Sequence, residues 1–266
     1  MKITFLGSGG AFSLAKENYH SNILLEEDGA NFLYDCGSTI GEALNDKGLE
    51  PKDIDSIYIS HLHGDHCGGI EYMAFKTYFG QFPFGVQKIN LFGHHSILQD
   101  GWMHSWSGGL KCIQGKELEL EDYFHTSYME LEDDMYFCGH KLQPVKTLHV
   151  KVDETDEGEV PSFGLSISTL EGKKIFISGD TQFDKENLMK YWLESNLIFN
   201  EVEFADYPNS VHTQYKDLLT LEDNIRKKMY LYHYSLNGKT FKELNEQVQK
   251  DGFKGLVQRG QEFSLD

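Results

Sequence analysis

Ser60-His61-Leu62-His63-Gly64-Asp65-His66 is the stretch that decides the fold of this 266-residue chain. Residues 54–59, just before it, alternate in polarity and are rich in β-branched side chains, which predicts a buried strand. The residues from Cys67 onward can open a helix. We therefore expect three imidazoles and one carboxylate on a short loop at a strand end, where a rigid scaffold presents them to an open cleft.

These donor types suit zinc and its first-row neighbours. His61 and His63 are two residues apart and can converge on one ion, whereas Asp65 and His66 diverge from that pair toward a second ion. Two-metal hydrolases hold such ions about 3.5–4 Å apart. The alternative is a polar surface loop with hydrogen-bonded histidines. The H-x-H-x-D-H spacing after a strand of buried type favours the metal interpretation.

The motif is the signature of the metallo-β-lactamase superfamily, which the chain resembles along nearly its whole length. The resemblance implies an α/β (α+β) fold, the αββα sandwich, in which two mixed β-sheets pack face to face and are flanked by helices. It implies a metal site at one edge of the sheets. It also implies three further ligands in chain order: a histidine, a bridging aspartate and a last histidine.

Three downstream residues match that order. His149 follows a predicted strand at 141–147 and is the best third histidine, while His140, at the start of the same strand, is its competitor at the opposite edge. Asp180 lies in an S-G-D-T sequence that follows a predicted strand and matches the bridging aspartate. His233 ends the apolar run Y-L-Y and resembles the terminal ligand.

Within the superfamily the chain looks most like the RNase Z-type phosphodiesterase branch. The start I-T-F-L-G-S-G at residues 3–9, the use of Asp65 with His66, and His212 followed by Thr213 carry this resemblance. The histidine that matches His212 in that branch lies near the scissile phosphate and binds no metal. It can stabilise transition-state charge or protonate the leaving oxygen. The alternative for His212 is a surface histidine at a helix entry.

RNase Z grips tRNA with a long arm inserted between the ligands that match His149 and Asp180. Only about thirty residues separate these positions here, enough for one hairpin. The chain has 24 Lys and Arg against 42 Asp and Glu, a net charge of −18, whereas proteins that hold long nucleic acids usually carry a basic face. The tRNA 3′-processing endonuclease is therefore the alternative, and a long nucleic acid is not the expected partner.

A closer resemblance is to the anti-Pycsar phosphodiesterases of bacteriophages and bacteria, which are compact, armless and similar in length. It implies hydrolysis of 3′,5′-cyclic mononucleotides such as cCMP and cUMP to 5′-nucleoside monophosphates, evasion of Pycsar antiphage defence, and a homodimer. It implies two Zn²⁺ ions, with Mn²⁺ as an alternative, and catalytic roles for Asp65 and His212. The implied ligands are His61, His63 and His149 for one ion, Asp65, His66 and His233 for the other, and Asp180 as the bridge.

Rival functions on the same fold are a thioester or lactam hydrolase and a non-enzymatic metal-binding or nucleotide-sequestering protein. The loop with His212 and the RNase Z-like start disfavour the former, and the complete ligand set disfavours the latter. His94, His95 and His104 fall outside the ligand order and are predicted not to be ligands of this site. His20 is predicted to lie at the surface or behind the ligands rather than to bind metal. The turn Gly7-Ser8-Gly9-Gly10 is interpreted as a tight strand connection rather than a phosphate cradle, because no Gly-Lys-Ser/Thr follows.

The rest of the sequence predicts one domain, 1–266, in the cytoplasm, which is the host cytoplasm if a phage encodes the protein. No apolar run is long enough to span a bilayer, the N-terminus reads as a strand rather than a signal peptide, and the four cysteines form no C-x-x-C pair. The segment Asp35-Cys36-Gly37 resembles a D-x-G motif that holds the histidine loop. The acidic stretch 117–132 is predicted as solvated hairpins or loops. The aromatic stretch 78–85 is assigned to core packing, with a pocket wall or a dimer contact as alternatives.

The remaining elements follow from hydrophobic period and turn residues. The predicted strands are 2–6, 21–26, 31–35, 88–92, 164–169, 174–178, 197–201, 229–232, 255–257 and 262–264, of which 21–26 and 31–35 form a hairpin through Glu27-Asp28-Gly29. The predicted helices are 39–47, 96–106, 185–192, 215–219, 222–228 and 242–250, and 152–160 is predicted as an acidic turn.

Overall fold

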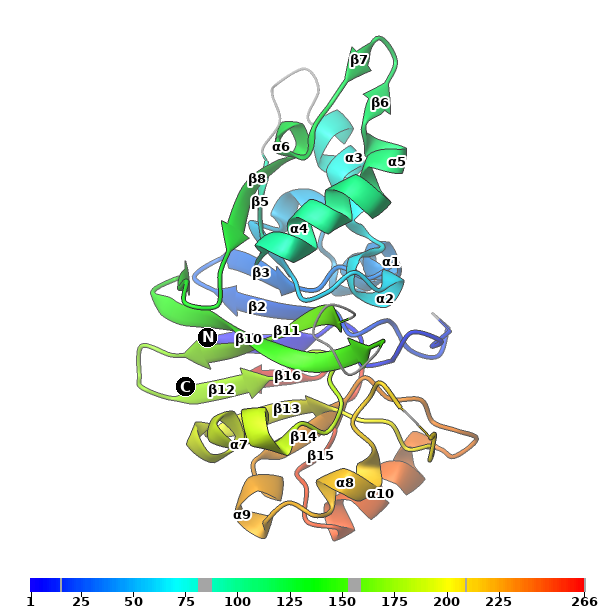
Figure 1. Cartoon of the computed structure of the whole chain (residues 1–266), viewed down its shortest axis with the longest axis vertical. Helices are drawn as coiled ribbons and strands as arrows, with labels where there is room; N and C mark the ends of the chain where they lie inside the picture. The colour runs from blue at the N-terminus through cyan, green and yellow to red at the C-terminus, as the bar shows by residue number, and fades with distance from the viewer. Residues whose placement is uncertain (15, 81–87, 153–158, 209, 266) are drawn as a thin grey trace. The chain divides into compact units, whose positions relative to one another are not determined.

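The structure is a computed structural model that describes residues 1–14, 16–80, 88–152, 159–208 and 210–265 (Figure 1). The chain divides into two compact units. The first unit comprises Met1–Gly7, Ser13–Glu130 and Arg259–Asp266, and the second comprises Ser8–Phe12 and Leu131–Gln258. Each unit is built on its own seven-stranded mixed sheet with helices beside it, as the resemblance implies. The assignment of 1–266 to a single domain stays a prediction.

The sheet of the first unit begins as an antiparallel meander and continues as parallel strands. Its strand order is β16 (Glu262–Ser264), β1 (Lys2–Phe5), β2 (Ile23–Glu27), β3 (Ala30–Tyr34), β4 (Ser56–Ile59), β5 (Ile89–His94) and β8 (Phe124–Met129). The parallel strands β3, β4, β5 and β8 end at one edge, so the residues that follow them are brought together there.

Helices and one small ribbon complete the first unit. They are α1 (Ile40–Lys47), a 3₁₀ turn (Pro51–Asp53), α2 (Gly64–Cys67), α3 (Ile70–Gly80), α4 (His95–Gly101), a π-helical turn (Trp102–Trp106), α5 (Ser107–Leu110), β6 (Cys112–Ile113), β7 (Lys116–Glu117) and α6 (Leu120–Tyr123). The predicted β2–β3 hairpin is confirmed: Asp28 and Gly29 form its two-residue turn, both with positive φ, as a type I′ turn requires. Gly48 ends α1 in the left-handed conformation.

The sheet of the second unit is antiparallel on one side and parallel on the other. Its order is β15 (Gly255–Leu256), β14 (Met229–Tyr232), β13 (Leu197–Glu201), β12 (Lys174–Ile177), β11 (Glu159–Ser168), β10 (His140–Lys151) and β9 (Met135–Phe137). Because β10 and β12 both run antiparallel to β11, they run in the same direction. The carboxyl ends of β10, β12, β13 and β14 therefore share one edge.

Four helices belong to the second unit: α7 (Lys185–Glu194), α8 (Tyr215–Leu218), α9 (Asp223–Arg226) and α10 (Phe241–Lys250). Helix α7 buries Leu188 and Trp192 in the core of this unit. Helix α10 begins with a capping box, in which the Thr240 hydroxyl accepts from the backbone N–H of Glu243 and the Glu243 carboxylate accepts from the N–H of Thr240. These contacts fix the predicted helices near 185–192 and 242–250.

Two expectations around the motif were wrong in local geometry. Asp65 and His66 lie in the short helix α2 rather than on a loop, because the backbone N–H groups of His66 and Cys67 already donate to the carbonyl of His63. Strand β10 extends to Lys151, so His149 lies within the strand and not past its end. The β10–β11 register shifts between Thr147 and Val150, and this irregularity is where His149 sits.

One downstream expectation was wrong and another was too short. The stretch 117–132, predicted as solvated hairpins or loops, contains α6 and the parallel edge strand β8. Phe124 and Met129 of β8 are buried, while the residues between them are mostly polar and hide the strand pattern. The predicted helix 96–106 continues to Leu110 through the π-helical turn. A Cβ on Gly101 would lie 2.5 Å from the Trp106 ring, so the glycine makes room for the indole.

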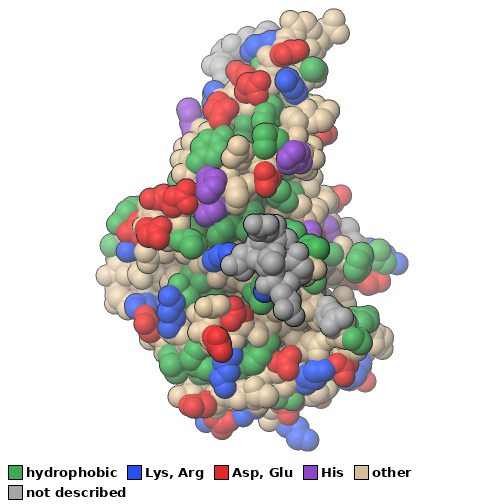
Figure 2. Space-filling view, in the orientation of Figure 1, with side chains coloured by type: hydrophobic (Ala, Val, Ile, Leu, Met, Phe, Trp, Pro, Cys, Tyr) green, Lys and Arg blue, Asp and Glu red, His purple; other side chains and the backbone are tan. Residues whose placement is uncertain are grey.

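The acidic turn at 152–160 and the aromatic stretch 78–85 lie partly outside the described residues, at 153–158 and 81–87. Among the described helices, none combines the length and apolar character that a membrane span requires. On the face drawn in Figure 2, lysine and arginine side chains are scattered among acidic ones.

Candidate metal centre

The first donor set (His61, His63, Asp65 and His66) follows β4 in the first unit. Asp35, which follows the neighbouring strand β3, holds this donor set in place through contacts with Ser60 and His66. One Asp35 oxygen accepts from the backbone N–H of Ser60 at 2.8 Å, and the other accepts from the Ser60 hydroxyl at 2.8 Å and lies 2.7 Å from His66 Nδ1. Burial raises the pKa of the Asp35 carboxyl, and the nearby His66 and the bonds from Ser60 oppose the rise.

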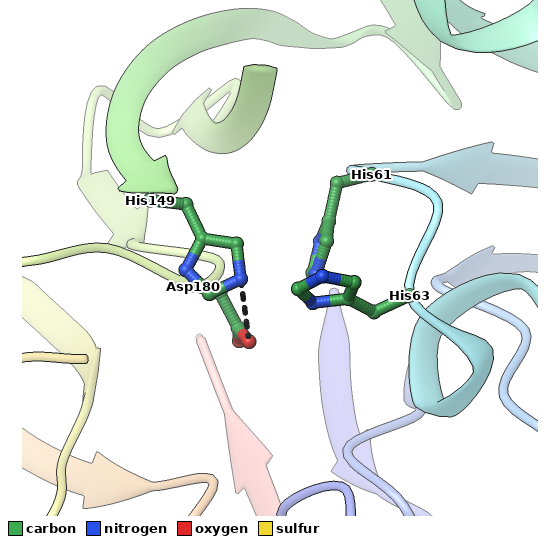
Figure 3. A group of neighbouring side chains, drawn as sticks. All are labelled: His61, His63, His149 and Asp180. Atoms are coloured by element: carbon green, nitrogen blue, oxygen red, sulfur yellow. Dashed lines mark ion pairs between the residues drawn. The ribbon is translucent and has the colours of Figure 1, made fainter. Parts of the chain in front are cut away.

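These contacts orient the imidazoles. His66 uses Nδ1 toward Asp35, and His61 uses Nδ1 toward the Ser60 hydroxyl at 3.0 Å, so Nε2 is the atom with which each ring could hold a metal. His66 Nε2 lies 3.2 Å from an Asp65 oxygen. The rings of His61 and His63 lie edge to face with centroids 4.7 Å apart (Figure 3). The structure therefore brings all four predicted ligands of this unit together.

The D-x-G motif has the structural role expected of it. The N–H of Cys36 donates to the carbonyl of His66 at 2.6 Å, and a Cβ on Gly37 would lie 2.0 Å from the carbonyl oxygen of Asp65. Only glycine permits that approach between the end of β3 and α2. His20 is buried beside this contact, with its backbone N–H bonded to the Thr39 hydroxyl, and is not a surface residue.

Replacing Asp35 by asparagine is expected to weaken zinc binding about 10- to 100-fold, because a carboxylate that orients histidines of the candidate metal site is replaced by a neutral amide. A competitive zinc titration with a chromophoric chelator measures the change. Asp55→Asn is the matched control, since Asp55 accepts from the N–H of Asn31 elsewhere in the same unit. Equal zinc affinity in Asp35→Asn and Asp55→Asn would refute the supporting role.

The second donor set (His149, Asp180 and His233) lies at the shared carboxyl edge of the second unit. Asp180 follows β12 after Ser178 and Gly179, and His233 follows β14 with a φ of 58°. Strands β12 and β14 run in the same direction, so the residues that follow their carboxyl ends, Asp180 and His233, lie at the same edge of the sheet. His140, the competitor of His149, lies at the other end of β10 and accepts from the N–H of Leu170.

Asp180 presents its two oxygens to different histidines. Its Oδ2 lies 3.7 Å from His149 Nε2 (dashed in Figure 3), whereas its Oδ1 lies 3.5 Å from His233 Nε2. The carboxylate is 1% exposed. His149 Nδ1 donates to the carbonyl of Val211 at 2.9 Å, which directs Nε2 toward Asp180. A carboxylate with one oxygen aimed at each of two imidazoles has the geometry that bridging two ions requires.

Glu201, at the end of β13, is a residue that the sequence analysis missed. It is fully buried, and its Oε1 accepts from the N–H groups of Thr181 and Thr213 at 3.1 and 2.8 Å. His212 Nδ1 lies 3.4 Å from the same oxygen and 3.7 Å from Asp180 Oδ2. Burial raises the pKa of Glu201, and the nearby His212 opposes the rise. The sequence did contain a clue: Glu201 is an acidic residue at the end of the mostly apolar strand β13, which runs parallel to the strand that precedes Asp180.

The glycine turn lies against the second donor set, as its interpretation as a strand connection implies. The backbone carbonyl of Ser8 accepts from the N–H of Tyr234, and Gly9 forms an isolated parallel β-bridge with Tyr234. A Cβ on Gly10 would approach His233 Cε1 to 3.3 Å. A cavity of about 530 Å³ opens beside these residues in the second unit. Its lining includes Gly10, Phe12, Tyr207, His212, His233 and Asn237.

The fold is shared with solved structures. The metallo-β-lactamase fold protein YhfI from Bacillus subtilis superposes with a TM-score of 0.74 at 18% identity, covering 98% of each chain. Human tRNase Z, short form, superposes with a TM-score of 0.68 at 20% identity, covering 100% of each chain. Together with the two mixed sheets and the H-x-H-x-D-H motif, these likenesses define a protein of the metallo-β-lactamase fold.

The chain belongs to the family of the anti-Pycsar protein Apyc1, whose family model matches residues 1–263. The Apyc1 protein of Paenibacillus harenae is 34% identical over 236 residues, which cover 88% of this chain and 90% of that protein. The Apyc1 protein of Bacillus phage vB_BsuM-Goe3 is 29% identical over 279 residues, covering 99% and 98%. The family resemblance drawn from the motifs is thus confirmed.

Proposed function

We propose that this protein is a metal-dependent phosphodiesterase that hydrolyses 3′,5′-cyclic mononucleotides such as cCMP and cUMP to 5′-nucleoside monophosphates. Its biological role is then the evasion of Pycsar antiphage defence. The observation that carries the proposal is the match of the anti-Pycsar family model to residues 1–263. The chemistry of the two donor sets supports the reaction class, because histidine and carboxylate donors suit metal-assisted hydrolysis.

The proposed ligands combine both donor sets in the chain order of the superfamily. By that order His61, His63 and His149 would hold one ion, Asp65, His66 and His233 would hold the other, and Asp180 would serve both. Zn²⁺ is the proposed metal and Mn²⁺ its alternative. The fit rests on the orientation of the rings: the Nδ1 atoms of His61, His66 and His149 are each engaged by a hydroxyl, a carboxylate or a carbonyl. Such outer contacts accompany metal-ligating histidines.

Two such ions, when bound, would supply charge neutralisation for the phosphate and an attacking water whose pKa is lowered to about 7. The residues of the chain do the rest. Asp65 orients the attacking water, and His212 faces the leaving 3′ oxygen and donates a proton to it as the P–O bond breaks. Glu201 holds the His212 ring through Nδ1, so that Nε2 is the atom that serves the substrate.

The nucleoside is proposed to lie in the cavity beside His212 and His233. At about 530 Å³ the cavity has the size of small-molecule sites. Phe12 is 94% exposed and Tyr207 is 57% exposed, so both rings are accessible to a nucleobase. Aromatic faces stack on any base, which fits acceptance of more than one cyclic nucleotide.

A homodimer and a location in the cytoplasm, that of the infected host if a phage encodes the protein, complete the proposal. The relatives include proteins from a bacterium and from a bacteriophage, which supports a role on either side of infection. A sedimentation-equilibrium measurement checks the dimer: a mass near twice that of the chain is expected, and a monomer at micromolar concentration would contradict it.

The substrate is tested with the zinc- or manganese-loaded protein and a panel of cCMP, cUMP, cAMP and cGMP beside a tRNA precursor. We expect conversion of cyclic pyrimidine nucleotides to 5′-monophosphates at many turnovers per protein, and loss of this activity after chelation. Stoichiometric binding of a cyclic nucleotide without formation of product would support the sequestering alternative. Cleavage of the tRNA precursor alone would replace the proposal with the RNase Z-like endonuclease.

A further inference from the structure

A second group of metal-type donors lies in the first unit, outside the predicted ligand set. His94 ends β5 and His95 begins α4, so the two rings are adjacent, with centroids 4.6 Å apart. Strand β8 runs parallel to β5 with Met129 opposite His94, so Glu130 follows at the same edge. Two imidazoles and one carboxylate from two neighbouring strand ends therefore meet at the surface.

The distances between these donors match a metal site. His95 Nδ1 lies 2.9 Å from Glu130 Oε1, and His94 Nε2 lies 3.5 Å from Glu130 Oε2. The three ligand atoms all lie within 4.8 Å of one another. Four ligands at zinc bond lengths of about 2.0–2.1 Å in a tetrahedron are about 3.3 Å apart. The two measured separations lie on either side of that value.

The contacts around His94 fit a ligand role. The Ser96 hydroxyl lies 2.9 Å and the Ser96 backbone nitrogen 3.4 Å from His94 Nδ1, so Nε2 is the nitrogen on the Glu130 side. In the structure Nδ1 accepts from the Ser96 N–H as the cap of α4. A metal bound at Nε2 would place the ring proton on Nδ1, which would then donate to the Ser96 hydroxyl, the arrangement that orients ligating histidines elsewhere. Figure 2 shows histidine side chains beside acidic ones near the end of β8. Water can reach the group, since the His95 and Glu130 side chains are 48% and 59% exposed.

We propose that His94, His95 and Glu130 bind a divalent transition-metal ion of the zinc type, separate from the ions assigned to the H-x-H-x-D-H motif. Two histidines and one glutamate leave a fourth position for water. The ion cross-links β5 and α4 to the end of β8, an edge strand of its sheet. The ion links the two ends of the chain segment between His95 and Glu130. Such a cross-link stabilises the folded state, because the ion binds the folded chain and offsets the entropic cost of closing the loop.

Zinc binding to the purified protein tests the site. Zinc content after equilibration and desalting is expected to fall by one equivalent in His95→Gln. Glu130→Gln is expected to lower the affinity for that zinc ion about tenfold or more. Each substitution removes one of three ligands. His125→Gln is the matched control, because His125 is an exposed histidine on β8. Equal zinc content in His95→Gln and His125→Gln would overturn the proposal.

A crystal soaked in zinc gives an independent readout that activity does not affect. An anomalous peak at the zinc edge is expected within bonding distance of His94 Nε2, His95 Nδ1 and Glu130. Peaks only at the motif histidines would leave the phosphodiesterase proposal intact and refute this site. A peak at this site in a protein that hydrolyses no cyclic nucleotide would support this site and refute the phosphodiesterase proposal.

Discussion

Asp180→Asn is expected to lower cyclic-nucleotide hydrolysis about 10³-fold or more and to remove at least one metal ion, because a metal site contributes several kcal/mol to the transition state. The carboxylate is buried, and each of its oxygens is directed to a different histidine. An amide has one oxygen and no charge, so it cannot neutralise two cations. The nitrogen that replaces an oxygen would also face His149 or His233 at 3.5–3.7 Å.

Initial rates on cCMP and metal content from the same preparation measure the two effects. Asp184→Asn is the control, because Asp184 belongs to the same unit, caps α7 by accepting from the N–H of Asn187, and takes no part in the donor set. We expect this control to keep both activity and metal. An Asp180→Asn protein that retains full activity and two metal ions would show that the bridge lies elsewhere.

The parts of the site that sequence analysis could predict are those written in a contiguous motif. The H-x-H-x-D-H stretch identified four donors, and the strand-ending sequences before Asp180 and His233 identified two more. Each works because a buried strand has an apolar, β-branched pattern that stops abruptly at a polar residue. The hairpin at Asp28-Gly29 was equally accessible, since positive φ at both turn positions selects these residues.

The parts that sequence analysis missed depend on register between strands. Glu201 accepts from Thr181, which lies beside it because β12 and β13 are parallel, and from Thr213, which the Glu203–Gln214 bridge brings back to the same strand end. The same holds for Glu130, which meets His94 and His95 through the β5–β8 pairing. Strand β8 was missed because its exposed side is polar and an acidic segment precedes it.

His212→Ala is expected to lower kcat about 10²- to 10⁴-fold, the usual contribution of a positioned general acid, with KM and metal content little changed. His212 is 24% exposed and lines the cavity of the second unit, so its ring can reach a substrate. Its Nδ1 faces Glu201 and Asp180, so the two carboxylates orient the imidazole. Loss of zinc together with activity would instead make His212 a ligand and require the ligand set to be revised.

Glu201→Gln separates positioning from packing in the same assay. Glutamine keeps the size of the side chain and an oxygen that accepts from Thr181 and Thr213, but it removes the charge beside His212. Since that charge orients the imidazole that donates the proton, the kcat of Glu201→Gln is expected to fall while KM changes little. A substrate with a better leaving group than a ribose 3′ oxygen should be affected less, because it needs less protonation. A kcat reduced equally for both leaving groups would indicate that Glu201 only maintains the fold of the loop.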